Sequence, residues 1–166
     1  MSNYLCGNFL FKNKLSIDKQ IELSYRIIEV VLAEHICVQL GYSIFQDTVF
    51  EIIGEKYKNL EGEHLPFFII DSPISNVSHE IISSFNHEYN KDDLLFLKEK
   101  LEKIKKVMEN ILNFREISQI ILFFSEGFDT EYKEINISLN EFVDSCIPLY
   151  IEENFFVPSL KYVFVK

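Results

Sequence analysis

Histidine is the first residue type to test for chemistry, because imidazole binds metal ions and transfers protons near neutral pH. Among the four histidines, His79 and Glu80 begin an HExxH-type pattern, but Ser83 occupies the position of the second histidine. A zinc site of that kind needs two imidazoles one helical turn apart, so we reject it. His35 falls on an apolar helical stripe, where a buried core histidine is the favoured interpretation. We predict no metal site and no cofactor.

Other side chains that perform catalysis show no recognisable arrangement. The chain has five glycines and no GxSxG, GxGxxG or GxxxxGK[ST] pattern, which leaves little for phosphate-binding loops or a nucleophilic serine. Cys6, Cys37 and Cys146 form no CxxC pair, so we expect three free thiols in a reducing compartment. Carboxylate pairs for acid/base chemistry stay open, because acids are so numerous that any pair could arise by chance. The favoured expectation is a protein that is not an enzyme.

The acidic residues are concentrated near the C-terminal end. Between Glu126 and Glu153 there are eight acids and one base, Lys133, so this segment carries −7 of the net charge of −10. The segment from Lys91 to Arg115 has seven bases and five acids, or +2. Such a field repels nucleic acid and anionic membranes and attracts a basic protein. A charge that serves solubility alone is the open alternative.

Aromatic residues lie among these acids. Phe128 and Tyr132 fall in a segment expected to be a loop, and aromatic anchors often carry the binding energy of an interface. A solvated acidic loop with core aromatics is an equally open interpretation. The candidate partner-binding residues are Glu126, Phe128, Asp129, Glu131, Tyr132, Glu134, Glu141 and Asp144.

The length and composition predict one domain over residues 1–166. With 166 residues, of which 48% are hydrophobic, the chain can bury a sizeable core without disulfides or metals. Residues 1–11 lack the basic start and long apolar core of a signal peptide, and no apolar run is long enough to span a membrane. These features predict a cytoplasmic protein.

The elements that position these residues are expected to be helices first. Ser16 is a plausible cap for a long helix that Gly41 ends, and its apolar residues are so numerous that we expect burial over much of its surface. That apolar stripe contains Ile17, Ile21, Ile27, Ile28, Val30, Val31, Leu32 and Val38. Shorter helices are expected near residues 47–57 and 77–85, and residues 65–71 fit a strand or a buried loop.

A clearer helix follows Asn90. Its apolar residues alternate spacings of three and four, which is an a/d seam about three heptads long. Packing within the domain is favoured over a coiled coil, because the seam is short and lies mid-chain. The seam consists of Leu94, Leu97, Leu101, Ile104, Met108 and Ile111.

The last third is expected to be β-rich. Residues 117–124 and 132–137 predict two strands, and residues 159–165 predict a closing strand. Ser138 and Glu141 form a capping box for an intervening helix, which Pro148 should end or kink. The predicted fold is therefore α+β (α/β in the wider sense), with an N-terminal helical portion packed on a small C-terminal β-sheet in strand-strand-helix-strand order.

The C-terminal third resembles bacterial immunity proteins of contact-dependent growth inhibition and polymorphic toxin systems. The resemblance covers residues 117–166 and rests on IILFFSEGFDTEYKEINISLNEFVDSCIPLYI followed by VPSLKYVFVK. These segments give the order strand, acidic loop, strand, helix and closing strand, in a small acidic protein without catalytic motifs.

The resemblance implies a cytoplasmic immunity protein that binds a cognate toxin domain, often a basic nuclease. It would occlude the toxin's active or substrate-binding site and need no cofactor, with its carboxylates taking the place of substrate phosphates. The alternative is a non-catalytic subunit or regulator in a stable assembly, docking through the Leu94–Ile111 helix.

Overall fold

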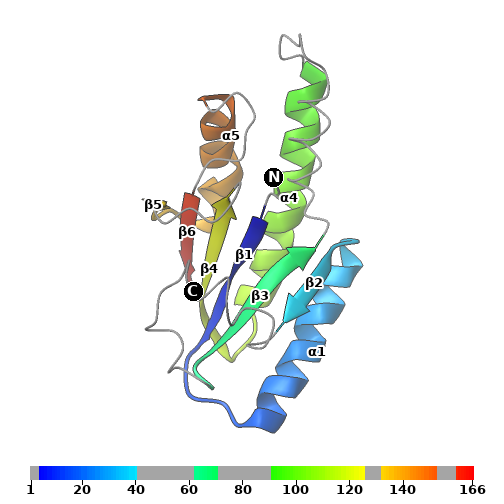
Figure 1. Ribbon diagram of the computed structural model, residues 1–166, viewed down its shortest axis with the longest axis vertical. Coiled ribbons are helices and arrows are strands. Elements are labelled where there is room, and N and C mark those ends of the chain that lie inside the picture. The colour runs from blue at the N-terminus through cyan, green and yellow to red at the C-terminus, as the bar shows by residue number, and fades with distance from the viewer. Residues whose placement is uncertain (1–3, 41–61, 71–90, 126–131, 153–159) are drawn as a thin grey trace.

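The computed structural model describes residues 4–40, 62–70, 91–125, 132–152 and 160–166 (Figure 1). These residues combine helices with a mixed sheet, as the sequence predicts. In chain order the elements are β1 (Tyr4–Phe11), α1 (Ile17–Ala33), β2 (Cys37–Leu40), β3 (His64–Ile70), α4 (Lys91–Leu112), β4 (Ile117–Ser125), β5 (Lys133–Ile135), the 3-10 helix η2 (Leu139–Glu141), α5 (Phe142–Glu152) and β6 (Leu160–Val165).

The six described strands form one sheet in the order β2-β3-β1-β4-β6-β5. Neighbouring strands are antiparallel except β5 and β6, which are parallel. Parallel neighbours need a crossover connection, and η2 and α5 lie on that crossover. In this strand order, β1 lies inside the sheet, between β3 and β4, rather than at its edge.

The three described α-helices, α1, α4 and α5, pack on one face of the sheet (Figure 1). Alternate residues of each long strand point to this face, because successive side chains of a strand point to opposite sides. Leu5 and Phe9 of β1 and Leu122 of β4 are among them, and they join buried residues of all three helices in one hydrophobic cluster. This cluster is the core that holds the helices on the sheet.

Phe142 anchors the start of α5 in this core. Its ring lies 5.0 Å from that of Tyr162 and 5.5 Å from that of Phe164, both on β6, and 6.0 Å from that of Phe124 on β4. Rings at these distances gain packing energy beyond simple burial, and the rings of Tyr162 and Phe164 meet that of Phe142 edge-on. The first turn of α5 is thus fixed to two strands at once.

Gly7 allows β1 to approach its neighbours closely. A Cβ atom at this position would collide with the carbonyl oxygen of Ile121 and lie 2.8 Å from the ring of Phe67. Any larger residue would push β4 or the Phe67 ring out of place, and the Phe67 ring stacks on Phe9 at 4.3 Å. Close packing against Ile121 and Phe67 therefore explains why residue 7 is glycine.

The expected N-terminal helical portion is corrected, because three strands lie in it. β1 was not expected: it is buried on both faces, so it lacks the polar alternation that marks a half-exposed strand. β2 takes residues that had been assigned to the long helix. The C-terminal strands therefore join a larger sheet instead of forming a small one of their own.

The first helix is shorter and more exposed than expected. α1 ends at Ala33, and His35 adopts the left-handed conformation (φ 57°) just beyond it. The backbone N–H of His35 bonds to the carbonyl of Leu32, and that of Ile36 to Val31, which together end the helix before Gly41. His35 is exposed, not a core residue. Ile17, Ile21 and Leu32 of the predicted buried stripe are also exposed.

Several other expectations are confirmed and one is wrong. The helix over the seam is α4, residues 65–71 contain most of β3, and β4 and β6 match their predicted strands closely. Pro148 does not end its helix, because α5 continues to Glu152. Pro148 and Asp144 are exposed, so water can hydrate the Asp144 carbonyl that loses its N–H donor. The helices expected at 47–57 and 77–85 lie outside the described residues.

Candidate partner-binding surface

The outer side of α5 carries two of the predicted binding acids. Its inner side buries Phe142, Val143, Cys146 and Tyr150 in the core. Asp144, Pro148 and Ile151 recur at helical spacings of four and three, so they share the opposite side. With the exposed neighbours Glu141 and Glu152, they form what we term the acidic face of α5: Glu141, Asp144, Pro148, Ile151 and Glu152.

Glu141 is fixed by the capping box that begins this helix. Its carboxylate accepts hydrogen bonds from the Ser138 hydroxyl at 2.5 Å and the Ser138 backbone N–H at 3.1 Å. The hydroxyl bond is the larger cause of a lowered pKa, and the backbone bond adds to it. The predicted capping box is confirmed, and the charge of Glu141 is held at one position beside Asp144.

Glu134 lies away from that face and has a partner within the sheet. The register pairs Glu134 of β5 with Lys161 of β6, and the Lys161 ammonium lies 2.6 Å from its carboxylate. Lys161 alternates with Leu160 and Tyr162, which point toward the helices, so Glu134 and Lys161 lie on the other sheet face. Asn136 donates a further hydrogen bond of 3.1 Å to Glu134. A cation of any partner protein would have to displace these contacts.

Tyr132 lies on the same side as Glu134. Its ring meets that of Phe123 edge-on, with 5.1 Å between centroids, and Phe123 is buried. Tyr132 is therefore partly a packing residue. The structure separates the four described candidates into two groups: Glu141 at the end of η2 with Asp144 on α5, and Tyr132 with Glu134 at the sheet edge. Glu126, Phe128, Asp129 and Glu131 lie outside the described residues.

Three residues of the acidic face of α5, namely Pro148, Ile151 and Glu152, are absent from the predicted site. Ile151 is 41% exposed, and Pro148 beside it is also exposed, so the acids border a small apolar surface. The signal was available: counting four and seven residues on from Asp144 reaches Pro148 and Ile151. This spacing is easy to miss when Pro148 is expected to end or kink the helix.

Two buried ionisable groups, Cys146 and Tyr162, lie close together near the start of α5. Cys146 is buried beneath α5, and desolvation raises the pKa of its thiol to about 12. Burial likewise raises the pKa of neighbouring Tyr162, so neither group ionises near neutral pH. No cluster of three or more His, Cys, Asp or Glu suited to a metal ion occurs within residues 4–40, 62–70, 91–125, 132–152 and 160–166.

A charged groove runs between the end of α1 and α4, with a volume of about 320 Å³. Its three acids and three lysines balance, and two pairs are already joined: Lys106 with Glu34 at 2.5 Å and Lys105 with Glu109 at 3.7 Å. Such a groove has no excess charge with which to select a partner. Its lining residues are Glu34, Glu102, Lys103, Lys105, Lys106 and Glu109.

The comparisons with known proteins add no relative. No protein-family model, curated protein or solved structure matches the chain. Each helix in the described part of the chain is too short or too polar to cross a membrane.

Proposed function

We propose that this protein is an immunity protein, which binds a cognate toxin domain with a basic surface and occludes its active or substrate-binding site. The observation that carries the proposal is the acidic face of α5. Asp144 and Glu152 lie on the outside of α5 next to exposed Ile151, and Glu141 ends the adjoining η2. Acids around a small apolar centre can attract a basic surface and then exclude water from it.

Rigid support favours the same surface. The Phe142 ring packs on β4 and β6, and Ser138 holds the Glu141 carboxylate. Fixed charges lose little conformational entropy when a partner binds, so more of the Coulomb attraction remains as binding free energy. The carboxylates would contact the Lys and Arg side chains with which a nuclease binds phosphate.

The resemblance to immunity proteins supplies the toxin as the partner. Its basis is the sequence of residues 117–166, with its expected order of strand, acidic loop, strand, helix and closing strand, together with the acidic composition of this region. We further propose a cytoplasmic location and a mode of action that needs no catalysis and no cofactor.

The alternative of an assembly subunit docking through α4 has less support. Leu97, Leu101 and Ile104 of the seam are fully buried in the core. A partner could reach only the other sides of α4, where charged residues of both signs predominate. The acidic face of α5, in contrast, is already exposed and open to a partner.

The test uses the toxin domain encoded next to this gene, with association rates measured against ionic strength. The variant Asp144→Lys/Glu152→Lys should associate about tenfold more slowly, with a flatter salt dependence. The matched control, Glu99→Lys/Glu102→Lys, makes the same charge change on exposed positions of α4. Equal slowing by both variants would mean that the association rate depends on net charge alone and not on the acidic face of α5. No slowing by either would reject the acidic face of α5.

Inhibition needs a separate measurement. Cells that express the toxin domain should survive when the wild-type protein is co-expressed and die with the Asp144→Lys/Glu152→Lys variant. Death in both cases, with binding intact, would contradict the immunity role while leaving the binding surface standing.

A further inference from the structure

A second apolar surface lies along α1, well away from α5 (Figure 1). Ile17, Ile21, Tyr25 and Leu32 are 74%, 51%, 66% and 53% exposed. With half-buried Ile28 between the last two, they follow helical spacings of four, four, three and four. These five residues form one stripe, termed the α1 stripe, on a different side of the helix from its buried residues Leu23, Ile27 and Val31.

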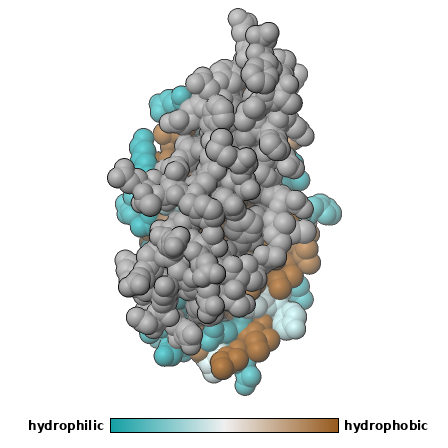
Figure 2. Space-filling view, viewed as in Figure 1, coloured by the Kyte–Doolittle hydropathy of each residue, from teal (hydrophilic) through white to brown (hydrophobic). Residues whose placement is uncertain are grey.

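Single exposed apolar residues are common on protein surfaces, but a row of them is not. Of the seven exposed large hydrophobic residues in the described part of the chain, four belong to the α1 stripe. In Figure 2, seen as in Figure 1, hydrophobic atoms gather at the lower right, where α1 lies. The exposed row is not needed to hold α1 on the core, because Leu23, Ile27 and Val31 already do this.

Acidic residues border the stripe along one side. Asp18, Glu22 and Glu29 recur at spacings of four and seven, and all three are exposed. None of them forms an ion pair with any described residue. The bases of α1 lie further round the helix, and Arg26 is already joined to Glu116 at 2.8 Å. The border is therefore a row of negative charges without neutralising partners among the described residues.

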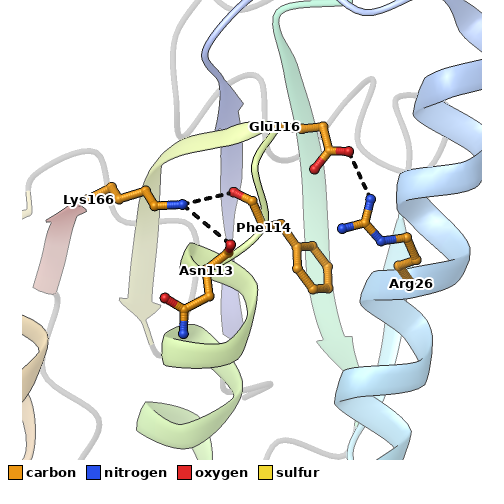
Figure 3. Close-up of polar contacts among 5 residues, drawn as sticks. All are labelled: Arg26, Asn113, Phe114, Glu116 and Lys166. Atoms are coloured by element: carbon orange, nitrogen blue, oxygen red, sulfur yellow. Dashed lines mark hydrogen bonds and ion pairs between the residues drawn. The ribbon is translucent and has the colours of Figure 1, made fainter.

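α1 is held firmly on the rest of the fold. Before its first turn, the N–H of Leu15 donates to the carbonyl of Gly62 at 2.7 Å. At its middle, Arg26 lies over the Phe114 ring at 4.3 Å and contacts Glu116 (Figure 3). Near its end, Lys106 pairs with Glu34 at 2.5 Å. A helix fixed at three points presents its stripe in one orientation, which lowers the entropy lost on binding.

We propose that the α1 stripe binds an amphipathic helix of another protein, one with an apolar stripe and a basic border. From Ile17 to Leu32 the stripe is about 22 Å long at the helical rise of 1.5 Å per residue, which matches four turns of a partner helix. Apolar residues would pack at the centre, and Lys or Arg of the partner would meet Asp18, Glu22 and Glu29.

Charge argues against a second copy of this chain as the occupant. An antiparallel pair of α1 helices would place the acidic borders against each other. A parallel pair would place each border against the side that carries Gln20 and Ser24, which offers no cation. A basic helix neutralises the border in either direction.

The test uses two synthetic peptide probes with the same leucine stripe, one bordered by lysines and one by glutamates. Binding to the full-length protein is measured by fluorescence anisotropy. The wild type should bind the lysine peptide at least about tenfold more tightly than the glutamate peptide, and Tyr25→Ser should weaken binding by about tenfold. Reversal of the border, Glu22→Lys/Glu29→Lys, should exchange the preference between the two peptides.

Two controls separate this surface from general acidity. The variant Glu99→Lys/Glu102→Lys makes the same change in net charge on exposed positions of α4 and should leave peptide binding unchanged. Circular dichroism melting should show that Tyr25→Ser remains folded. The proposal is overturned if Glu22→Lys/Glu29→Lys keeps the original preference. It is also overturned if sedimentation shows a wild-type dimer that Tyr25→Ser dissociates, because the occupant would then be a second copy.

Discussion

Arg26 and Glu116 join α1 to the turn that precedes β4. Nη1 of Arg26 lies 2.8 Å from Oε1 of Glu116, and its guanidinium covers the Phe114 ring at 4.3 Å (Figure 3). The hydrogen bond to Arg26 is the largest cause of a lowered Glu116 pKa. On the other side of the same turn, the Lys166 ammonium donates to the carbonyls of Asn113 and Phe114 at 3.4 and 3.3 Å.

The Arg26–Glu116 pair predicts an acid-sensitive contribution to stability. A carboxyl whose pKa is lower in the folded state stabilises the fold above its unfolded pKa, about 4.3 for glutamate, and loses that effect as the pH falls through the folded value. Glu116→Gln should cost about 0.2–1 kcal/mol near neutral pH, because both side chains are partly exposed. The difference from wild type should vanish in acid. Urea unfolding across pH measures it, with Glu99→Gln as the unpaired control.

Two cysteines should resist modification in the native protein. Cys6 and Cys146 are free and buried, and burial raises the pKa of each thiol to about 12. Thiolate is the reactive form, so iodoacetamide at neutral pH should label these positions only after unfolding. Peptide mass spectrometry with and without urea gives the comparison. Rapid native labelling of either residue would contradict the burial of β1 or α5.

The seam of α4 should contribute to stability as part of the core. Leu101→Ala removes a fully buried side chain and should lower the free energy of unfolding by about 2–5 kcal/mol. Leu95→Ala is the matched control, because the same atoms are removed from a side chain that is 57% exposed. Its effect should stay within about 0.5 kcal/mol. Similar losses for both variants would mean that α4 is packed differently.

His35→Gly should stabilise the protein. His35 has φ 57°, a conformation that strains most residues but suits glycine, and its side chain is exposed. A gain of a few tenths to about 1 kcal/mol is expected, reduced by glycine's greater freedom in the unfolded chain. Thermal unfolding should show a higher Tm, whereas His35→Val should lower it. Destabilisation by glycine would show that the imidazole makes a needed contact.

How much of this fold the sequence predicts depends on how local each signal is. The a/d spacing of α4 and the apolar run of β4 need no knowledge of the rest of the chain, and both were predicted closely. The end of α1 is not predictable in this way, because Val38 of β2 continues the helical spacing of apolar residues by coincidence. Only the hydrogen bonds of His35 and Ile36 reveal the break.

The candidate site was predictable in composition but not in arrangement. The acids of residues 126–153 are plain in the sequence. That Lys161 neutralises Glu134 depends on the register of β5 against β6, which no local pattern specifies. Equally, Ile17 and Leu32 read as core residues, since a sequence shows that a residue is apolar but not which neighbour covers it.

The central place of β1 has a consequence for how the chain folds during synthesis. β1 is synthesised before the other described strands, yet one of its neighbours, β4, pairs Ser125 with Tyr4, so that edge stays open until residue 125 has been translated. Pairings between distant segments form slowly, and most side chains of β1 are apolar. Until β4 has been made, the nascent chain should therefore expose an apolar segment, and β1 is the segment that a chaperone would be expected to bind.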